Sequence, residues 1–217
     1  MKKLLIASAF LLGCGSDQDS KLQIVNGQNT YRSWFVKLNG CGGTLISSDT
    51  VLTAKHCNHQ VNFKAKIGLY KRNDPNNGGK PLAEKIKITK VIKHTSRDLQ
   101  LLKLEKPSRF RPIKLYEGNL SKGDRLAAFG FGNTEYGGSA PEFLQGAVFY
   151  YTGEGAREGI IRANNRPYQA VCHGDSGSPV IFQGELVATV TFTEGRCSTK
   201  GSMGFTRLDI GWINKNI

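Results

Sequence analysis

Short stretches of β-branched and alternating apolar residues, separated by Gly, Asn and Asp, run through most of this sequence. Such stretches predict strands, and the polar clusters between them predict turns. The strands are expected at 35–38, 44–46, 51–53, 63–67, 85–88, 126–129, 147–151, 179–182 and 186–190. Only the end, where Leu208, Ile210, Ile213 and Ile217 recur at roughly helical spacing, predicts a helix. The chain of 217 residues is therefore expected to be all-β, a barrel or a sandwich, with no internal sequence repeat.

The N-terminus is typical of an export signal. Lys2 and Lys3 make the start positive, and the apolar stretch 4–12 is too short to span a membrane. The stretch ends in Leu-Leu-Gly-Cys, which resembles a bacterial lipoprotein signal in which Cys14 becomes the lipid-bearing first residue. We expect a signal over 1–13 and a tether over 14–23. The protein would then be a lipoprotein of the cell envelope as a precursor, and periplasmic or extracellular once processed. The alternative is an ordinary signal cleaved near a cysteine.

Charge is concentrated in one block of the chain. The net charge is +13, and residues 61–125 hold 17 Lys and Arg against six acidic residues. A positive field favours anionic partners, although no nucleic-acid-binding motif accompanies it. Lys85, Lys87, Lys90, Lys93 and Arg97 alternate along strand-like sequence and predict one basic stripe. The alternative is an ordinary solvated surface.

The cysteines leave a disulfide pattern open. With Cys14 set aside, four of the five cysteines remain: Cys41, Cys57, Cys172 and Cys197. Four cysteines allow three pairings, and spacing does not choose among them. Beyond the N-terminus, no apolar run approaches the roughly 20 residues of a membrane span, so a transmembrane bundle is excluded.

Three segments carry candidate reactive residues. Ser176 lies between glycines in Gly-Asp-Ser-Gly-Ser-Pro, where a tight bend directs backbone N–H groups at one point. A Ser hydroxyl needs a general base, and His56 is the best candidate. Asp98, at the head of an apolar strand, is the candidate acid that orients His56. Each has an ordinary structural alternative, but the order His56, Asp98, Ser176 in these contexts resembles the trypsin/chymotrypsin family of serine peptidases.

The resemblance extends from residue 24 to the end of the chain. The segment 24–27 resembles the N-terminus that the family exposes on activation, and 41–46 with 51–57 resemble the strands around its histidine. Gly130-Phe131-Gly132 and the end around Ile213 also match. The resemblance implies two perpendicular six-stranded antiparallel Greek-key barrels and a C-terminal α-helix. We expect the barrels to cover 24–115 and 116–217, in a monomeric endopeptidase without cofactor or metal.

The resemblance also implies a role for each site residue. Ser176 would attack, His56 would act as base and then acid, and Asp98 would orient His56. The N–H groups of Gly174 and Ser176 would form the oxyanion hole.

Activation and the disulfides are carried over in the same way. A separate protease would cut after Gln23, and the freed Ile24 ammonium would pair with Asp175. Thr191 occupies a position near the triad at which the family usually has Ser. The implied disulfides are Cys41–Cys57 and Cys172–Cys197.

Specificity is read from the positions that line the family's pocket: Ala170, Val171, Thr193 and Met203. Trypsin-like members place an Asp at the position of Ala170, where it pairs with Arg or Lys of the substrate, so Ala170 removes that charge. Thr193 and Met203 are expected to fill the pocket. The pattern resembles an elastase-like pocket for small aliphatic side chains, although the Met203 alignment can slip to Gly204. The alternatives are cleavage after Arg or Lys, and a non-catalytic lipoprotein that binds anionic partners.

Some residues depart from the family pattern. Lys55 replaces a small residue beside His56, which puts the local geometry in question. His59 and His94 have no assignable role. A zinc site from His56 and His59 lacks further ligands.

Overall fold

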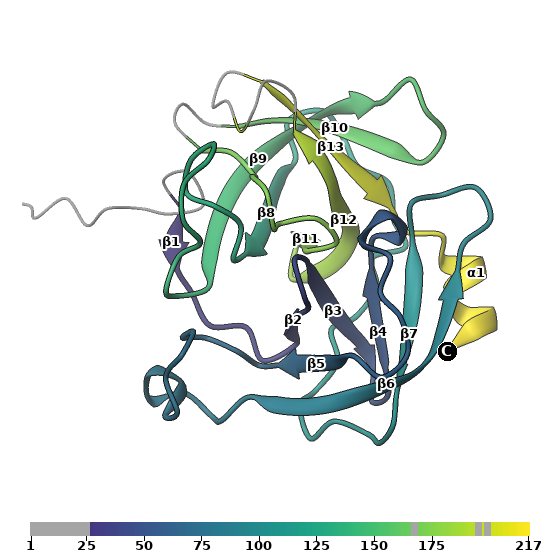
Figure 1. Cartoon of the computed structure of the whole chain (residues 1–217). Coiled ribbons are helices and arrows are strands. Elements are labelled where there is room, and N and C mark those ends of the chain that lie inside the picture. Colours follow the sequence, from purple (N-terminus) through teal and green to yellow (C-terminus); the bar gives the residue numbers. More distant parts are fainter. Residues whose placement is uncertain (1–26, 166–168, 194–196, 198–200) are drawn as a thin grey trace, which may run out of the picture.

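The structure is a computed structural model that describes residues 27–165, 169–193, 197 and 201–217. The expected signal, the tether, Cys14 and Ile24 lie outside the described residues. Two closed barrels of antiparallel strands make up the molecule (Figure 1), as the resemblance implied. No helix among the described residues is long and apolar enough to cross a membrane.

The first barrel closes in the order β2-β3-β4-β7-β6-β5. Its strands are β2 (Phe35–Lys37), β3 (Gly42–Ser47), β4 (Thr50–Thr53), β5 (Lys64–Ile67), β6 (Glu84–Lys93) and β7 (Gln100–Leu104). Two 3-10 turns, η1 (Lys55–Cys57) and η2 (Asn77–Gly79), lie in its loops. β4 pairs with β7 across a long connection, which is the Greek-key pattern.

The second barrel repeats this strand order as β8-β9-β10-β13-β12-β11, closed by the pairing of β8 with both β9 and β11. Its strands are β8 (Arg125–Gly130), β9 (Gln145–Glu154), β10 (Ile160–Asn165), β11 (Pro179–Phe182), β12 (Glu185–Thr193) and β13 (Ser202–Arg207). The shared topology leaves no repeat in the sequence, because a barrel constrains the alternation of buried positions more than residue identity.

Three apolar clusters hold the barrels together. One fills the first barrel around Val36 and Leu45, and one fills the second around Phe149 and Phe205. The third lies between the barrels, where the rings of Phe35 and Phe131 have centroids 5.7 Å apart. Such ring pairs contribute about 0.5–1.5 kcal/mol beyond their buried area. The catalytic candidates lie over this junction.

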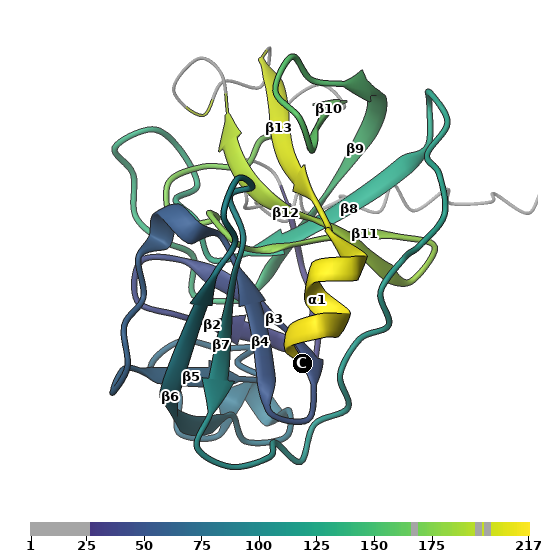
Figure 2. The same cartoon turned by 90° about the vertical axis from the view of Figure 1, so that its right-hand side faces the viewer.

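Both ends of the described chain cross between the barrels. The short strand β1 (Gln28–Asn29) pairs with β9 of the second barrel. The helix α1 (Ile210–Asn216) follows β13 but lies beside β4 and β7 of the first barrel (Figure 2), with Ile213 fully buried in the junction cluster. Asp209 caps the helix by accepting a hydrogen bond from Trp212 N at 2.9 Å. The division at residue 115 stays a proposal.

Three strands, β1, β10 and β13, were not expected from the pattern. β10 and β13 pair with each other along their length, and β13 also pairs with β12. Met203 and Phe205 are fully buried and lie on one face of β13, but Gly204 between them has a low propensity for strands, which weakens the local signal. Pairing on both sides therefore decides the strand, where local propensity does not.

The basic residues of β6 lie on both sides of a β-bulge. The register with β7 shifts between Ile88 and Lys90, so the alternation along the strand breaks there. Lys93 donates to Asn58 at 2.9 Å, whereas Arg97 donates to Leu208 O at 3.0 Å. The expectation of a single stripe from Lys85 to Arg97 stays a prediction.

Candidate active site

His56 lies in the turn η1, directly after the buried strand β4. The end of β4 is held by Thr53, whose hydroxyl donates to Gly42 O at 2.7 Å. The disulfide Cys41–Cys57 ties the next residue to the start of β3, as the resemblance implied. His56 is thus carried on a turn restrained at both ends, while its side chain stays 44% exposed.

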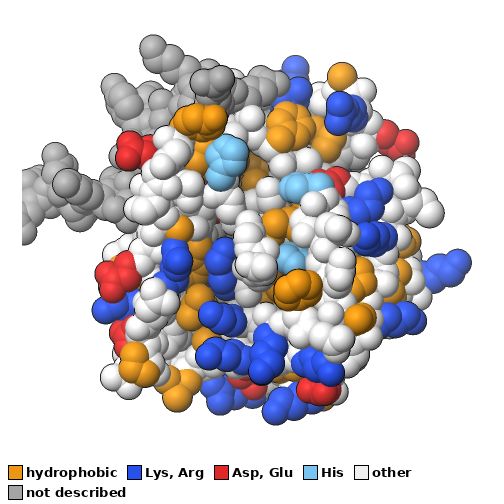
Figure 3. All heavy atoms as spheres, viewed as in Figure 1, with side chains coloured by type: hydrophobic (Ala, Val, Ile, Leu, Met, Phe, Trp, Pro, Cys, Tyr) orange, Lys and Arg blue, Asp and Glu red, His pale blue; other side chains and the backbone are white. Residues whose placement is uncertain are grey.

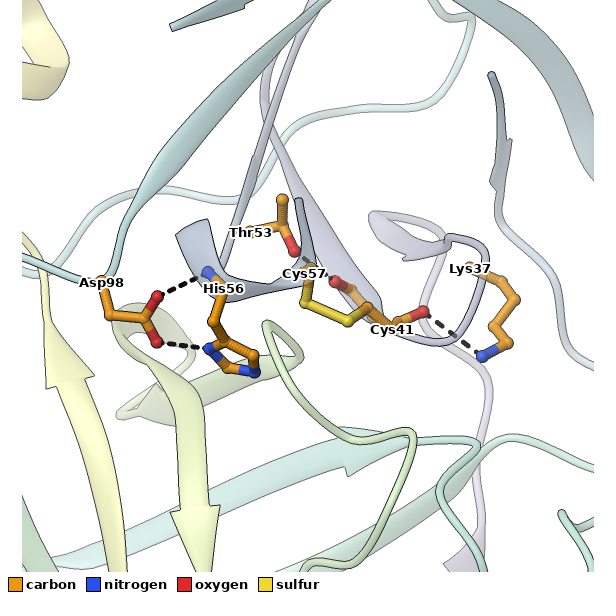
Figure 4. The surroundings of a disulfide bond; sticks show 7 residues. Lys37, Cys41, Thr53, His56, Cys57 and Asp98 are labelled. Carbon is orange, nitrogen blue, oxygen red and sulfur yellow. Dashed lines mark hydrogen bonds and ion pairs between the residues drawn. A yellow bond between two sulfur atoms is a disulfide. The ribbon is translucent and has the colours of Figure 1, made fainter. Parts of the chain in front are cut away.

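Asp98 makes two hydrogen bonds with His56 (Figure 4). The His56 backbone N–H donates to Asp98 Oδ1 at 2.8 Å, and Nδ1 lies 2.6 Å from Oδ2. The hydrogen bond to Asp98 raises the pKa of His56 above its usual value, although burial opposes it. Burial raises the pKa of Asp98, but the hydrogen bonds from His56 outweigh this and lower it overall. The arrangement fixes the imidazole ring and favours its charged form.

Ser176 lies in a tight turn packed against the segment before His56. Its carbonyl accepts from Gly42 N at 2.9 Å, and Gly177 N donates to Val190 O at 2.7 Å. Gly177 has φ +73°, and a Cβ there would collide with Thr53 and Ala54. Close approach therefore requires glycine at this position. The structure brings the serine turn to the His56 segment by packing, and it describes no hydrogen bond between Ser176 Oγ and His56.

Two backbone donors in the serine turn have no acceptor among the described residues. The N–H groups of Asp175, Gly177 and Ser178 donate to carbonyls of the chain. Within the described part of the chain, those of Gly174 and Ser176 donate to no acceptor. Gly174 has φ +97°, a conformation that side chains rarely adopt. These are the two donors that the resemblance assigns to an oxyanion hole.

Asp175 is buried beneath the turn and 1% exposed. Its carboxylate accepts from Gly132 N at 2.7 Å and from Cys172 N at 2.9 Å. A Cβ at Gly130 or Gly132 would collide with this carboxylate, so both positions require glycine. Burial raises the pKa of Asp175 to about 6, although these backbone hydrogen bonds lower it. No ion pair reaches Asp175 from the described residues, and its expected partner Ile24 lies outside them.

A cavity of about 430 Å³ adjoins Ser176. Of the four residues expected to form the specificity pocket, Val171 and Thr193 line it, whereas Ala170 and Met203 are fully buried in the core beside it. The described residues that line it include no acidic side chain. The cavity therefore carries no fixed negative charge from those residues.

Two further residues of β12 shape this cavity. Phe192, which the sequence analysis missed, lines it, and a Cβ at Gly204 would collide with its ring. The only sequence signal was the glycine, whose small size accommodates the ring. Thr191 also lines the cavity, and its hydroxyl lies 2.6 Å from the Thr206 hydroxyl.

Lys55 and His94 position the two halves of the His56–Asp98 pair. Lys55 Nζ donates to His94 O at 3.0 Å, which ties the His56 turn to the loop that carries Asp98. His94 is 7% exposed, and its Nδ1 accepts from the N–H groups of Ser96 and Arg97. Its Nε2 lies 3.2 Å from Asp209 at the start of α1. The sequence marked Lys55 as unusual and His94 as unassigned, but it did not show that the two residues contact each other.

His59 is buried beside the disulfide Cys41–Cys57. Burial lowers the pKa of His59 to about 4, with a further contribution from Lys37. Both sulfur atoms are bonded to each other, so they are not thiolate ligands for a metal. The disulfide Cys172–Cys197 is also present, next to the serine turn.

Known proteins resemble this chain over nearly its whole length. The family described as Trypsin matches residues 24–213. The anionic trypsin of Bos taurus is 30% identical over 93% of this chain and 92% of its own length. Trypsin I-P1 of Gallus gallus is 32% identical over 91% of this chain and 90% of its own.

Solved structures share the fold at lower identity. Neuropsin, a serine protease of mouse brain, superposes with a TM-score of 0.78 at 21% identity, over 87% of this chain and 97% of its own. Human heparin binding protein gives 0.77 at 21% identity, over 87% of this chain and 94% of its own. On the family match, the curated relatives and the two-barrel fold, this chain belongs to the trypsin family of serine endopeptidases.

Proposed function

We propose that Ser176, His56 and Asp98 form the catalytic triad of this endopeptidase and hydrolyse peptide bonds through an acyl-enzyme. The observation that most supports this is the pair of hydrogen bonds between His56 and Asp98, beside the packed serine turn. With Nδ1 donating to Asp98, the imidazole keeps Nε2 available as a proton acceptor.

The proposed reaction has two halves. Ser176 Oγ attacks the substrate carbonyl while His56 Nε2 takes its proton, and His56 then protonates the leaving amine. Water, activated by His56, hydrolyses the acyl-enzyme and restores the serine. In each half the carbonyl oxygen gains negative charge, and the unused N–H groups of Gly174 and Ser176 are suited to stabilise it.

A fluorophosphonate probe tests this assignment on the protein that begins at Ile24. We expect covalent labelling of Ser176 and cleavage of a peptide library. Replacing Ser176 by Ala should abolish labelling and lower turnover by several orders of magnitude. Normal hydrolysis by a correctly folded Ser176→Ala protein would contradict the assignment. A folded wild-type protein that neither labels nor cleaves would favour the non-catalytic lipoprotein.

We further propose an elastase-like preference for small aliphatic residues before the scissile bond. The support is the lining beside Ser176, in which the described residues include no acidic side chain, and the space filled by Ala170 and Met203 in the core. One methylene in an apolar pocket changes discrimination by only about 1–3 kcal/mol, so the preference should be graded. The same peptide-library profile tests this preference. A preference for Arg or Lys before the scissile bond would contradict the proposed specificity.

Activation is proposed to follow cleavage after Gln23. The support is Asp175, whose carboxyl is buried and whose pKa is raised by that burial. The ammonium of Ile24 would compensate the negative charge of this carboxylate. Removing one partner of a buried ion pair costs about 3–5 kcal/mol, enough to keep the uncut form inactive. Gln23 does not suit a pocket for small aliphatic residues, so a separate protease is expected to make the cut.

A lipid at Cys14 would anchor only the precursor. The bond after Gln23 lies between Cys14 and the barrels, and the other four cysteines are paired in disulfides. Activation would therefore leave residues 14–23 in the membrane and release the enzyme. Cell fractionation with N-terminal sequencing checks this. An active membrane-bound form that still begins at lipidated Cys14 would contradict the coupling without affecting the triad.

A further inference from the structure

A second cavity, of about 510 Å³, lies on the other side of the serine turn. It meets the first cavity at His173, which lines both, and it also borders Gly174. Four basic side chains line it: Lys37, Lys64, Lys66 and Arg72. No acidic residue is among its described lining residues. We call this cavity the cationic groove.

The register of the first barrel gathers these lysines. β2 pairs with β5 so that Lys37 lies opposite Lys66, and Lys64 follows the same outward face of β5. Across the next pairing, Lys66 lies opposite Lys85 and Lys64 opposite Lys87. Figure 3 shows Lys and Arg side chains gathered over the surface where β5 and β6 lie in Figure 1. Like charges placed directly opposite destabilise a sheet, so this arrangement carries a cost without an anion.

The neighbouring acidic groups do not neutralise the groove. Asp74 and Glu142 pair with Lys71, at 3.5 and 3.3 Å. Within the part of the chain that the structure describes, Lys64, Lys66 and Arg72 form no ion pair. The positive charge of these three residues is therefore available to a ligand.

Lys37 forms the inner end of the groove. Its Nζ donates to Cys41 O at 3.3 Å, on the far side of the Cys41–Cys57 disulfide from His56 (Figure 4). Burial lowers the pKa of Lys37, the buried Asp175 opposes this, and Arg72 and Lys66 lower it further. Asp175 lies beneath the turn and is closed off from the groove surface. An anion entering the groove would interact with these ammonium groups more strongly than at an open surface, because the effective dielectric constant is lower there.

The position of the groove tells which part of a substrate reaches it. Under the proposed function, the residue before the scissile bond occupies the cavity lined by Thr191 and Thr193. The oxyanion lies at Gly174, so the chain after the scissile bond continues toward the groove. We propose that the cationic groove binds acidic side chains in the residues just after the scissile bond, and that the enzyme prefers substrates with Asp or Glu there.

Three matched quenched peptides test this preference on the enzyme that begins at Ile24. They share the residues before the scissile bond and carry Asp-Asp, Asn-Asn or Lys-Lys two and three places after it. We expect kcat/KM to be about tenfold higher for Asp-Asp than for Asn-Asn, and lower still for Lys-Lys. The advantage should shrink as salt rises from about 0.05 to about 0.5 M, since salt screens exposed charges.

Charge-matched variants locate the effect. Lys64→Gln with Lys66→Gln should bring the Asp-Asp to Asn-Asn ratio close to one. Lys90→Gln with Lys106→Gln removes the same charge from exposed positions outside the groove and should leave the ratio unchanged. A ratio within one enzyme is insensitive to a loss of folded protein. If the control pair lowers the ratio as much as the groove pair, the effect is net charge alone and the proposal fails.

The proposal rests on the catalytic assignment, and a nitroanilide substrate separates the two. It ends at the scissile bond and does not reach the groove. If wild type cleaves neither the nitroanilide nor the peptides, the catalytic assignment fails. If it cleaves the nitroanilide and all three peptides equally well, the groove proposal alone fails. Equal cleavage together with inhibition by a sulfated polysaccharide that requires Lys64 and Lys66 would assign the groove to a polyanion instead.

Discussion

At the scale of single residues, Lys55 joins the two segments that carry His56 and Asp98. Its ammonium donates to the carbonyls of His94 and Thr95, at 3.0 and 3.4 Å. We expect Lys55→Met to keep the length of the side chain but loosen the pair, with kcat falling about fivefold for about 1 kcal/mol of lost hydrogen bonding. Because the hydrogen bond to Asp98 raises the pKa of His56, the acidic limb of the pH–rate profile should move to lower pH.

Two variants show whether that effect is specific. Lys55→Arg keeps a donor and should restore most of the rate. Lys90→Met removes an exposed lysine elsewhere on the first barrel and should leave both the rate and the acidic limb unchanged. A rate loss for Lys55→Met with an unmoved acidic limb would indicate a merely structural role.

At the scale of elements, strand register decides where the basic block points. Lys85 and Lys87 alternate as the sequence predicts, and a bulge after Ile88 lies between them and Lys90 and Lys93. Their charged neighbours are instead Lys66 and Lys64, on the adjacent strand β5. A pattern read along one strand specifies which side chains share a face, whereas the partner strand depends on turn geometry and pairing. Three residues of the basic block, Lys64, Lys66 and Arg72, therefore line the cationic groove beside the serine turn.

At the scale of the whole molecule, Asp175 links the processed N-terminus to the active site. In the uncut chain its folded pKa of about 6 lies above the usual 3.8. The stability that its neutral form contributes is full below pH 3.8 and is lost as pH rises through about 6. A shift of about two pKa units corresponds to about 3 kcal/mol. We expect the uncut Ser176→Ala protein to unfold at lower denaturant concentration at pH 7.5 than at pH 4.5.

The comparison must isolate Asp175 from other titrating groups such as His56. An uncut protein with Ser176→Ala and Asp175→Asn shares that background and should show a smaller loss of stability across the same pH range. Cleavage after Gln23 should recover much of the loss at pH 7.5, because an ammonium then compensates the carboxylate. Identical pH dependence of the Asp175 and Asp175→Asn proteins would rule out Asp175 as the titrating group.

The sequence alone determined the all-β fold, the terminal helix around Ile213 and the set of candidate reactive residues. Alternation, turn residues and the glycine-flanked Ser176 are local signals, so they can be recognised from neighbouring residues in the sequence. The tertiary structure decided what depends on contacts between distant segments. It pairs Lys55 with the His94 carbonyl, leaves the Gly174 and Ser176 donors unused, buries Asp175 and places Lys37 beside Lys66. Such contacts arise from strand pairing and barrel closure, and no single segment carries the information for them.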